Sequence, residues 1–122
     1  NIIDSAIEYK KLDKSNLVPK DYNNKVMAMI FKKNSTRTRV SFEAAMYKIG
    51  GHAIFLSEET TQLKRGENIM DTAKVLSGMV DIVMMRTNSN EEILSLAENS
   101  SVPIINGLCN LFHPILGCCW RN

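Results

Sequence analysis

The chain has 122 residues, 44% of them hydrophobic, which is enough for the core of one ordinary domain. Its net charge of +2 gives no reason to expect nucleic-acid binding, and it contains no apolar run long enough to span a bilayer. The three cysteines lie within the last 14 residues and two are adjacent, which matches neither a disulfide framework nor a zinc site. We therefore expect free thiols in a reducing compartment and no bound metal.

The first part of the chain predicts a helix, a strand and a second helix. Residues 4–12 have the spacing of a short amphipathic helix. Residues 25–31 form a short apolar run, which predicts a buried strand. A polar loop follows, and residues 37–49 then have near-helical spacing of their apolar side chains. Gly50-Gly51 is expected to end this helix.

The rest of the chain repeats the alternation of strands and helices. Strands are predicted over residues 53–56, 81–85 and 102–105, and helices over 69–79 and 91–98. The strands are continuous apolar runs, and such runs are typical of a parallel sheet that helices cover on both faces. The sequence therefore predicts an α/β fold with a parallel four-stranded sheet flanked by helices.

Periodicity also predicts which helix residues face the core. In the helix over 37–49 the expected inward residues are Val40, Phe42 or Ala44, and Tyr47. In the helix over 69–79 they are Ile69, Ala73, Leu76 and Met79. The methionines of the strands are expected to be core residues as well.

Ligands of parallel α/β sheets bind at the carboxyl ends of the strands, so chemistry is expected in the polar segments that follow them. These segments are residues 32–39, 57–67, 86–87 and 106–113. The most informative is Ser35-Thr36-Arg37-Thr38-Arg39, because the first turn of a helix attracts anions. Hydroxyl groups and a planar guanidinium add donors suited to a phosphate.

The two arginines of this turn cannot both serve an anion. Arg39 lies about 200° round the helix from Arg37, so we expect one on the ligand and the other in a structural ion pair. The simpler alternative is a hydroxyl helix cap with two solvated arginines. Arg86 and His113, which also follow strands, favour the anion site. Together the three strand ends predict a planar, anionic ligand that carries a carbonyl group.

Six segments of the chain resemble the aspartate and ornithine carbamoyltransferases. They are Phe31 to Glu43, Gly50 to His52, Gln62 to Glu67, Asp71 to Ser77, Val102 to Leu108, and His113-Pro114. They occur in family order and spacing over residues 22–114. The loop from Gln62 to Glu67 and the stretch from Asn106 to Pro114 resemble the ornithine type more than the aspartate type.

The resemblance implies transfer of a carbamoyl group from carbamoyl phosphate to L-ornithine, giving citrulline and phosphate, without a cofactor. Ser35, Thr36, Arg37 and Thr38 would hold the phosphate. Arg86 and His113 would be the catalytic residues: Arg86 bridges phosphate and carbonyl oxygens, and His113 polarises the carbonyl. Gln62 would reach the site of a neighbouring subunit in a homotrimer. The family further implies arginine metabolism in the cytoplasm, or in the mitochondrial matrix of a eukaryote.

The chain departs from the family pattern after His113-Pro114. Leu116 stands where a glutamine is expected, and residues 115–122 read as a divergent tail. We expect a carbamoyl-phosphate-binding domain over 1–114, a clipped start, and no ornithine-binding domain. Such a chain would bind carbamoyl phosphate and fail to transfer it. The alternatives are a non-catalytic remnant that binds carbamoyl phosphate or phosphate, a degraded gene product without function, and a carbamoyltransferase for another amine such as aspartate.

Overall fold

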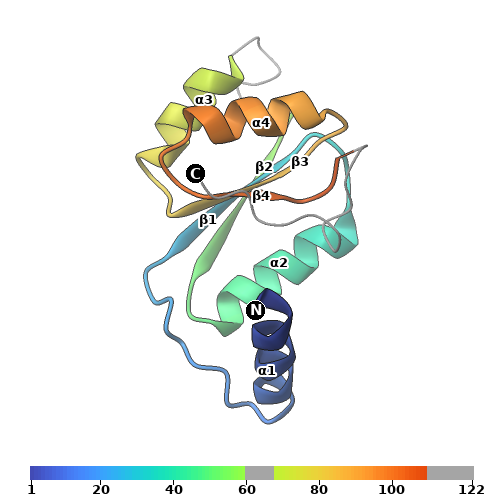
Figure 1. Ribbon diagram of the computed structural model, residues 1–122, viewed down its shortest axis with the longest axis vertical. Helices are drawn as coiled ribbons and strands as arrows, with labels where there is room; N and C mark the ends of the chain where they lie inside the picture. The colour runs from blue at the N-terminus through green and yellow to red at the C-terminus, as the bar shows by residue number, and fades with distance from the viewer. Residues whose placement is uncertain (60–67, 110–122) are drawn as a thin grey trace.

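The computed structural model describes residues 1–59 and 68–109 (Figure 1). Its elements are α1 (Ile2–Lys14), β1 (Val26–Phe31), α2 (Thr36–Lys48), β2 (His52–Ser57), α3 (Ile69–Ser77), β3 (Ile82–Arg86), α4 (Asn90–Asn99) and β4 (Ile104–Asn106). The four strands form one sheet in the order β2-β1-β3-β4, and each neighbouring pair is parallel. The predicted α/β fold with a parallel four-stranded sheet flanked by helices is therefore confirmed.

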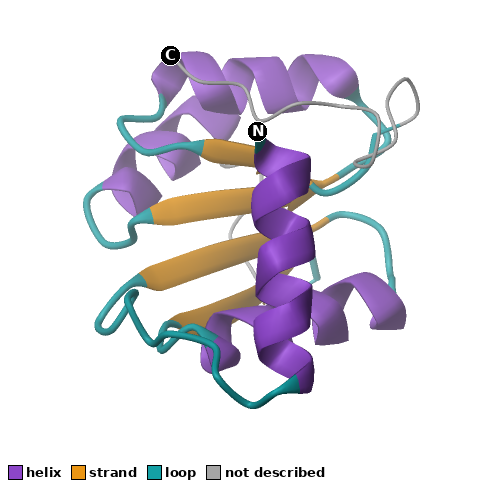
Figure 2. Cartoon of the chain, turned by 60° about the horizontal axis from the view of Figure 1, so that its bottom comes forward, coloured by secondary structure: helices purple, strands orange, loops and turns teal. Residues whose placement is uncertain are grey.

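Helices lie on both faces of the sheet. Helices α3 and α4 lie together on one face, and α2 lies on the other (Figure 1). Figure 2 shows the strands side by side with the helices outside them. The central strands are buried because both faces are covered: Met29, Ile30, Met84 and Met85 are each 0% exposed. The strand methionines are core residues, as predicted.

Alternate strand residues supply two separate cores. Ala28, Ile30, Val83 and Met85 pack with residues of α3 and α4, including Ala73, Ile93 and Leu96. Met27, Met29, Phe31 and Met84 pack on the opposite face with Met46, Phe42 and Ile49 of α2 and its end. This division follows the period of two that places successive strand side chains on opposite faces.

Two predicted inward faces are wrong in part. Val40 is 56% exposed and Tyr47 is 75% exposed, while α2 buries Met46 instead. The contact with the sheet follows Phe42, Met46 and Ile49, which are four and three residues apart. Met79 is 73% exposed because α3 ends at Ser77, two residues earlier.

Helix α1 differs from the other helices because none of its residues is buried. An ion pair joins it to α2: the Lys48 Nζ lies 2.6 Å from the Asp13 Oδ1. Ile2, Ile3 and Ile7 remain at least half exposed. Within the described residues, no helix combines the length and apolar character needed to cross a membrane.

Candidate functional site

The carboxyl ends of the four strands lie side by side. Phe31, the last residue of β1, is in register with Ser57 of β2 and with Arg86 of β3. Met85 of β3 is in register with Asn106, the last residue of β4. The loops after these strands therefore meet at one edge of the sheet, which is the edge where ligands of parallel sheets bind.

The loop after β1 leads into α2 through a hydroxyl cap. Ser35 is extended, with φ −158° and ψ 104°, and its Oγ accepts a hydrogen bond from the Thr38 backbone N–H at 3.4 Å. The Ser35 hydroxyl also donates to the Thr38 Oγ1 at 2.9 Å. No carboxylate occupies the first turn of α2, although α1 and α3 each carry one there and α4 carries two. The positive end of the α2 dipole is thus not neutralised by its own residues.

Arg86 reaches this turn from the end of β3. Its Nη1 donates to the Thr38 Oγ1 at 2.9 Å and to the Gly107 carbonyl oxygen at 3.4 Å. Its Nε is buried and has no hydrogen-bond partner among the described residues. A guanidinium offers several N–H donors, and only one nitrogen of Arg86 makes these contacts. The structure therefore brings a partly buried cation to the first turn of α2.

The two arginines of the turn separate as their spacing predicts. Arg39 forms an ion pair with Glu43, Nε to Oε1 at 3.2 Å, and its guanidinium lies 3.7 Å from the ring centroid of Phe55. Arg37 is exposed and makes no hydrogen bond or ion pair with another described residue. Arg39 is thus the structural arginine, and Arg37 is the one whose guanidinium is available.

A hollow of about 460 Å³ adjoins the Ser35 cap. It is lined by Phe31, Asn34, Ser35, Thr36, Arg39, Val40 and Phe55. The rings of Phe31 and Phe55 lie 5.3 Å apart and form its apolar wall. The cap and the stacked arginine thus border a recess large enough for a small polar molecule.

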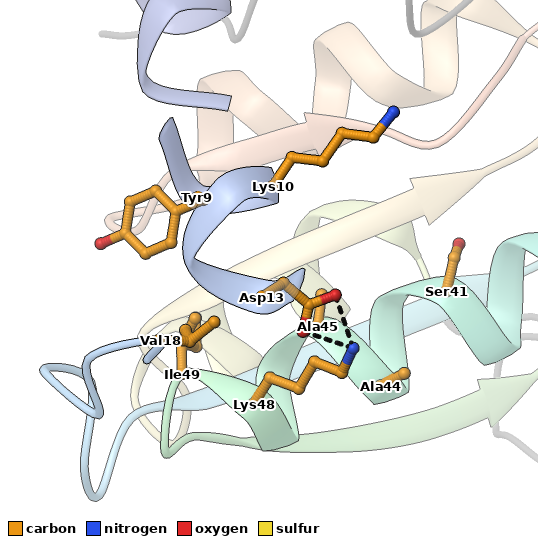
Figure 3. Close-up of a pocket in the computed structure, with 9 residues that line it drawn as sticks. All are labelled: Tyr9, Lys10, Asp13, Val18, Ser41, Ala44, Ala45, Lys48 and Ile49. Carbon is orange, nitrogen blue, oxygen red and sulfur yellow. Dashed lines mark hydrogen bonds and ion pairs between the residues drawn. The ribbon is translucent and has the colours of Figure 1, made fainter. Parts of the chain in front are cut away.

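A second hollow, of about 740 Å³, lies between α1 and the later turns of α2 (Figure 3). Its lining combines aliphatic side chains with polar ones, and the Asp13–Lys48 ion pair crosses it. The charged groups of this pair neutralise one another. The lining contains no arginine, so it lacks the planar guanidinium that the Ser35 turn brings to an anion.

One set of polar contacts at the sheet edge was not predicted. The Lys32 Nζ lies 2.5 Å from the Glu92 Oε1 and 3.8 Å from the Glu58 Oε1. The other oxygen of Glu92 accepts a hydrogen bond from the Thr87 hydroxyl at 2.5 Å. These residues join the loops after β1 and β3 to the start of α4.

Two of the predicted site residues, Gln62 and His113, lie outside the described residues, as does the segment 115–122. Of the others, the structure brings Ser35, Thr38 and Arg86 into contact and places Thr36 and Arg37 in the same turn. No group of His, Cys, Asp or Glu side chains that could hold a metal ion occurs in the described part of the chain. The available chemistry is the binding of an anion through hydroxyl, backbone and guanidinium donors.

Known proteins share this sequence and this arrangement. The family model for the aspartate/ornithine carbamoyltransferase carbamoyl-P binding domain matches residues 1–116. A relative from Ruthia magnifica subsp. Calyptogena magnifica, named ornithine carbamoyltransferase, is 57% identical over 93% of this chain. The chain spans 38% of the length of that relative.

Solved structures agree with this match. The ornithine carbamoyltransferase from Burkholderia thailandensis E264 is 50% identical and superposes with a TM-score of 0.81, over 86% of this chain and 36% of that one. The enzyme from Pyrococcus furiosus is 46% identical with a TM-score of 0.84, over 88% of this chain and 34% of that one. The chain therefore belongs to the aspartate/ornithine carbamoyltransferase family, and it contains the carbamoyl-phosphate-binding domain of that family.

Proposed function

We propose that this chain binds carbamoyl phosphate for a carbamoyl transfer to L-ornithine. The observation that carries the proposal is the contact between Arg86 and Thr38, which joins a cation to a helix start that lacks its own carboxylate. A phosphate placed there gains backbone N–H groups, hydroxyl donors and the helix dipole together. The names of the relatives support ornithine as the acceptor.

In this proposal the residues of the α2 turn bind the phosphate group. Ser35, Thr36 and Thr38 supply hydroxyl groups, and Arg37 supplies a guanidinium that can bind two oxygens at once. Arg86, which contacts Thr38 of this turn, binds the phosphate and the carbonyl oxygen. These groups hold the ligand in one orientation, which lowers the entropic barrier to the reaction.

The proposed chemistry requires stabilisation of developing negative charge. The amine nitrogen attacks the carbonyl carbon, the bond from that carbon to the phosphate oxygen breaks, and the amine loses a proton. Arg86 and His113 would stabilise the oxyanion during the attack, and Arg37 would stabilise the departing phosphate. Gln62 of a neighbouring subunit would complete the site in a homotrimer. Cytoplasmic location and a role in arginine metabolism stay predictions from the family.

The domain boundaries follow the same proposal. In this proposal residues 1–114 form the carbamoyl-phosphate domain, and the groups that hold the amine would lie outside the 38% of the relative that this chain spans. We expect the purified chain to bind carbamoyl phosphate without transferring it. A citrulline assay with ornithine, run against a buffer control, tests this expectation, and citrulline above the control would contradict it.

Titration calorimetry with carbamoyl phosphate, and with inorganic phosphate as a stable substitute, tests the binding site directly. We expect saturable binding that Arg37→Ala weakens by about tenfold or more, because a charge-assisted contact is lost. Lys74→Ala is the matched control, since it removes one exposed positive charge from the last turn of α3. Absence of saturable binding, or equal losses in both variants, would refute the proposed site.

A further inference from the structure

Lys32 is a cation at the sheet edge whose charge is already neutralised. It is the first residue after β1 and lies three residues before the Ser35 cap. Its Nζ contacts the Glu92 Oε1 at 2.5 Å and the Glu58 Oε1 at 3.8 Å, and its side chain is only 20% exposed. A partly buried ion pair is less screened by solvent than a surface pair. Lys32 therefore holds its loop in place and is not a free charge for the ligand.

Glu92 makes a second connection with its other oxygen. The Thr87 hydroxyl donates to the Glu92 Oε2, and Thr87 directly follows Arg86 and is 3% exposed. Thr87 Oγ1 in turn accepts a hydrogen bond from the Ser89 backbone N–H at 3.2 Å. One carboxylate of α4 thus holds both loops that carry the proposed anion donors.

The backbone adds to this link. The Lys32 N–H donates to the Arg86 carbonyl oxygen at 2.9 Å, so the side-chain and backbone contacts join the same two loops. These contacts keep the Arg86 guanidinium close to the α2 turn, where its Nη1 lies 2.9 Å from the Thr38 Oγ1. If the loops separated, Arg86 would lose this contact and would keep, among the described residues, the longer one to the Gly107 carbonyl oxygen at 3.4 Å.

We propose that Glu92 is a positioning residue of the carbamoyl-phosphate site, which it orders through Lys32 and Thr87 without touching the ligand. The inference rests on the proposed function and names a residue that sets the affinity of the site. Glu92 fixes the distance between the end of β3, which carries Arg86, and the loop that leads into α2. The anion then meets donors that are already in position, and less binding free energy is lost in ordering them.

The direction in which anion affinity changes when Glu92 is neutralised separates a positioning role from simple electrostatic repulsion. Glu92 carries a negative charge near an anion site, so its removal should strengthen anion binding if Coulomb repulsion alone mattered. Positioning predicts the opposite, a weaker affinity after the carboxylate is neutralised. Glu92 also lies in the first turn of α4, where any carboxylate stabilises the helix. Glu91 lies in the same turn and is exposed, so it provides the matched control for that effect.

Calorimetry with inorganic phosphate and with carbamoyl phosphate, at fixed ionic strength, tests the proposal. We expect Glu92→Gln and Lys32→Met to weaken binding by about fivefold or more, a normal size for the coupling between contacting residues. Lys32→Arg keeps the ion pair, so its affinity should stay within about twofold of the wild-type value. The control Glu91→Gln should also stay within about twofold. The double variant Lys32→Met/Glu92→Gln should bind no more weakly than the weaker single variant. Unchanged or tighter binding by Glu92→Gln would overturn the proposal.

A second measurement does not depend on binding. The Arg86 Nε–H is buried, so it should exchange slowly with water and give a resolved guanidinium N–H signal in nuclear magnetic resonance spectra. Glu92→Gln should shift or broaden this signal, and Glu91→Gln should leave it unchanged. If the wild-type chain binds neither phosphate nor carbamoyl phosphate, the proposed function fails, and the Arg86 signal still decides the positioning role. An identical Arg86 signal in Glu92→Gln and the wild type would refute that role.

Discussion

Replacement of Arg86 by methionine should separate the stability of the fold from the affinity of the site. The Arg86 Nη1 donates to the Thr38 Oγ1 at 2.9 Å, and a hydrogen bond from a charged donor contributes about 1.5–3 kcal/mol. The Arg86 Nε is buried without a described partner, and such a donor costs about 1–3 kcal/mol. The two contributions nearly cancel, and methionine fills the space of the aliphatic stem.

We therefore expect the free energy of unfolding of Arg86→Met to stay within about 1 kcal/mol of the wild-type value in urea titrations. The dissociation constant for phosphate should rise by about 10- to 150-fold, since one charge-assisted contact is lost. Arg86→Lys keeps the charge and loses the planar fork, so its affinity for phosphate should lie between those of the wild type and Arg86→Met. A loss of more than about 3 kcal/mol of stability with unchanged phosphate affinity would refute this reasoning and make Arg86 a structural residue.

Two further predictions concern stability. The Val26 backbone N–H, at 2.9 Å, and the Lys25 ammonium, at 3.3 Å, lower the pKa of Asp81 from its ordinary value of 3.8. A carboxyl whose pKa is lower in the folded state stabilises the fold above its unfolded pKa, and this contribution is lost as the pH falls below it. Urea midpoints of the wild type should therefore fall more steeply than those of Asp81→Asn below about pH 4, and parallel curves would contradict the assignment. Met84→Ala should lower the free energy of unfolding by about 2–5 kcal/mol, because Met84 is 0% exposed. Met79→Ala, at a 73% exposed position, should lower it by less than about 0.5 kcal/mol. Equal effects of the two substitutions in urea titrations would contradict the assigned core.

The strands could be predicted from local pattern because each is a continuous apolar run, and such runs are buried wherever helices cover both faces. The inward face of α2 could not. Its sequence carries two apolar stripes at helical spacing, one through Val40 and Tyr47 and another through Phe42 and Met46. Spacing alone does not say which stripe meets the sheet. In the structure the second stripe does, with Met46 buried and Phe42 partly buried against the same cluster.

The meeting of Arg86 with the α2 turn followed from a rule of topology, since Arg86 ends β3, the α2 turn follows β1, and these two strands proved to be neighbours. The link through Glu92 had no such signal. Glu92 is 60 residues from Lys32 in the chain and lies in the first turn of a helix, where a carboxylate is common for reasons of its own. A contact of this kind depends on how α4 is placed over the sheet, and that placement is set by the burial of Ile93 and Leu96.

The distribution of charge over the helix starts supports the proposal that an anion binds at the α2 turn. Helices α1, α3 and α4 begin with acidic side chains. Each such side chain stabilises its helix by about 0.3–1 kcal/mol through attraction to the positive end of the helix dipole. Helix α2 has Arg37 in that turn, and Arg86 lies against it, so positive groups meet a positive helix end. This arrangement lowers stability unless an anion is bound. In the proposed site a phosphate would supply the negative charge that the other helices obtain from their own carboxylates, and its binding would then stabilise the fold.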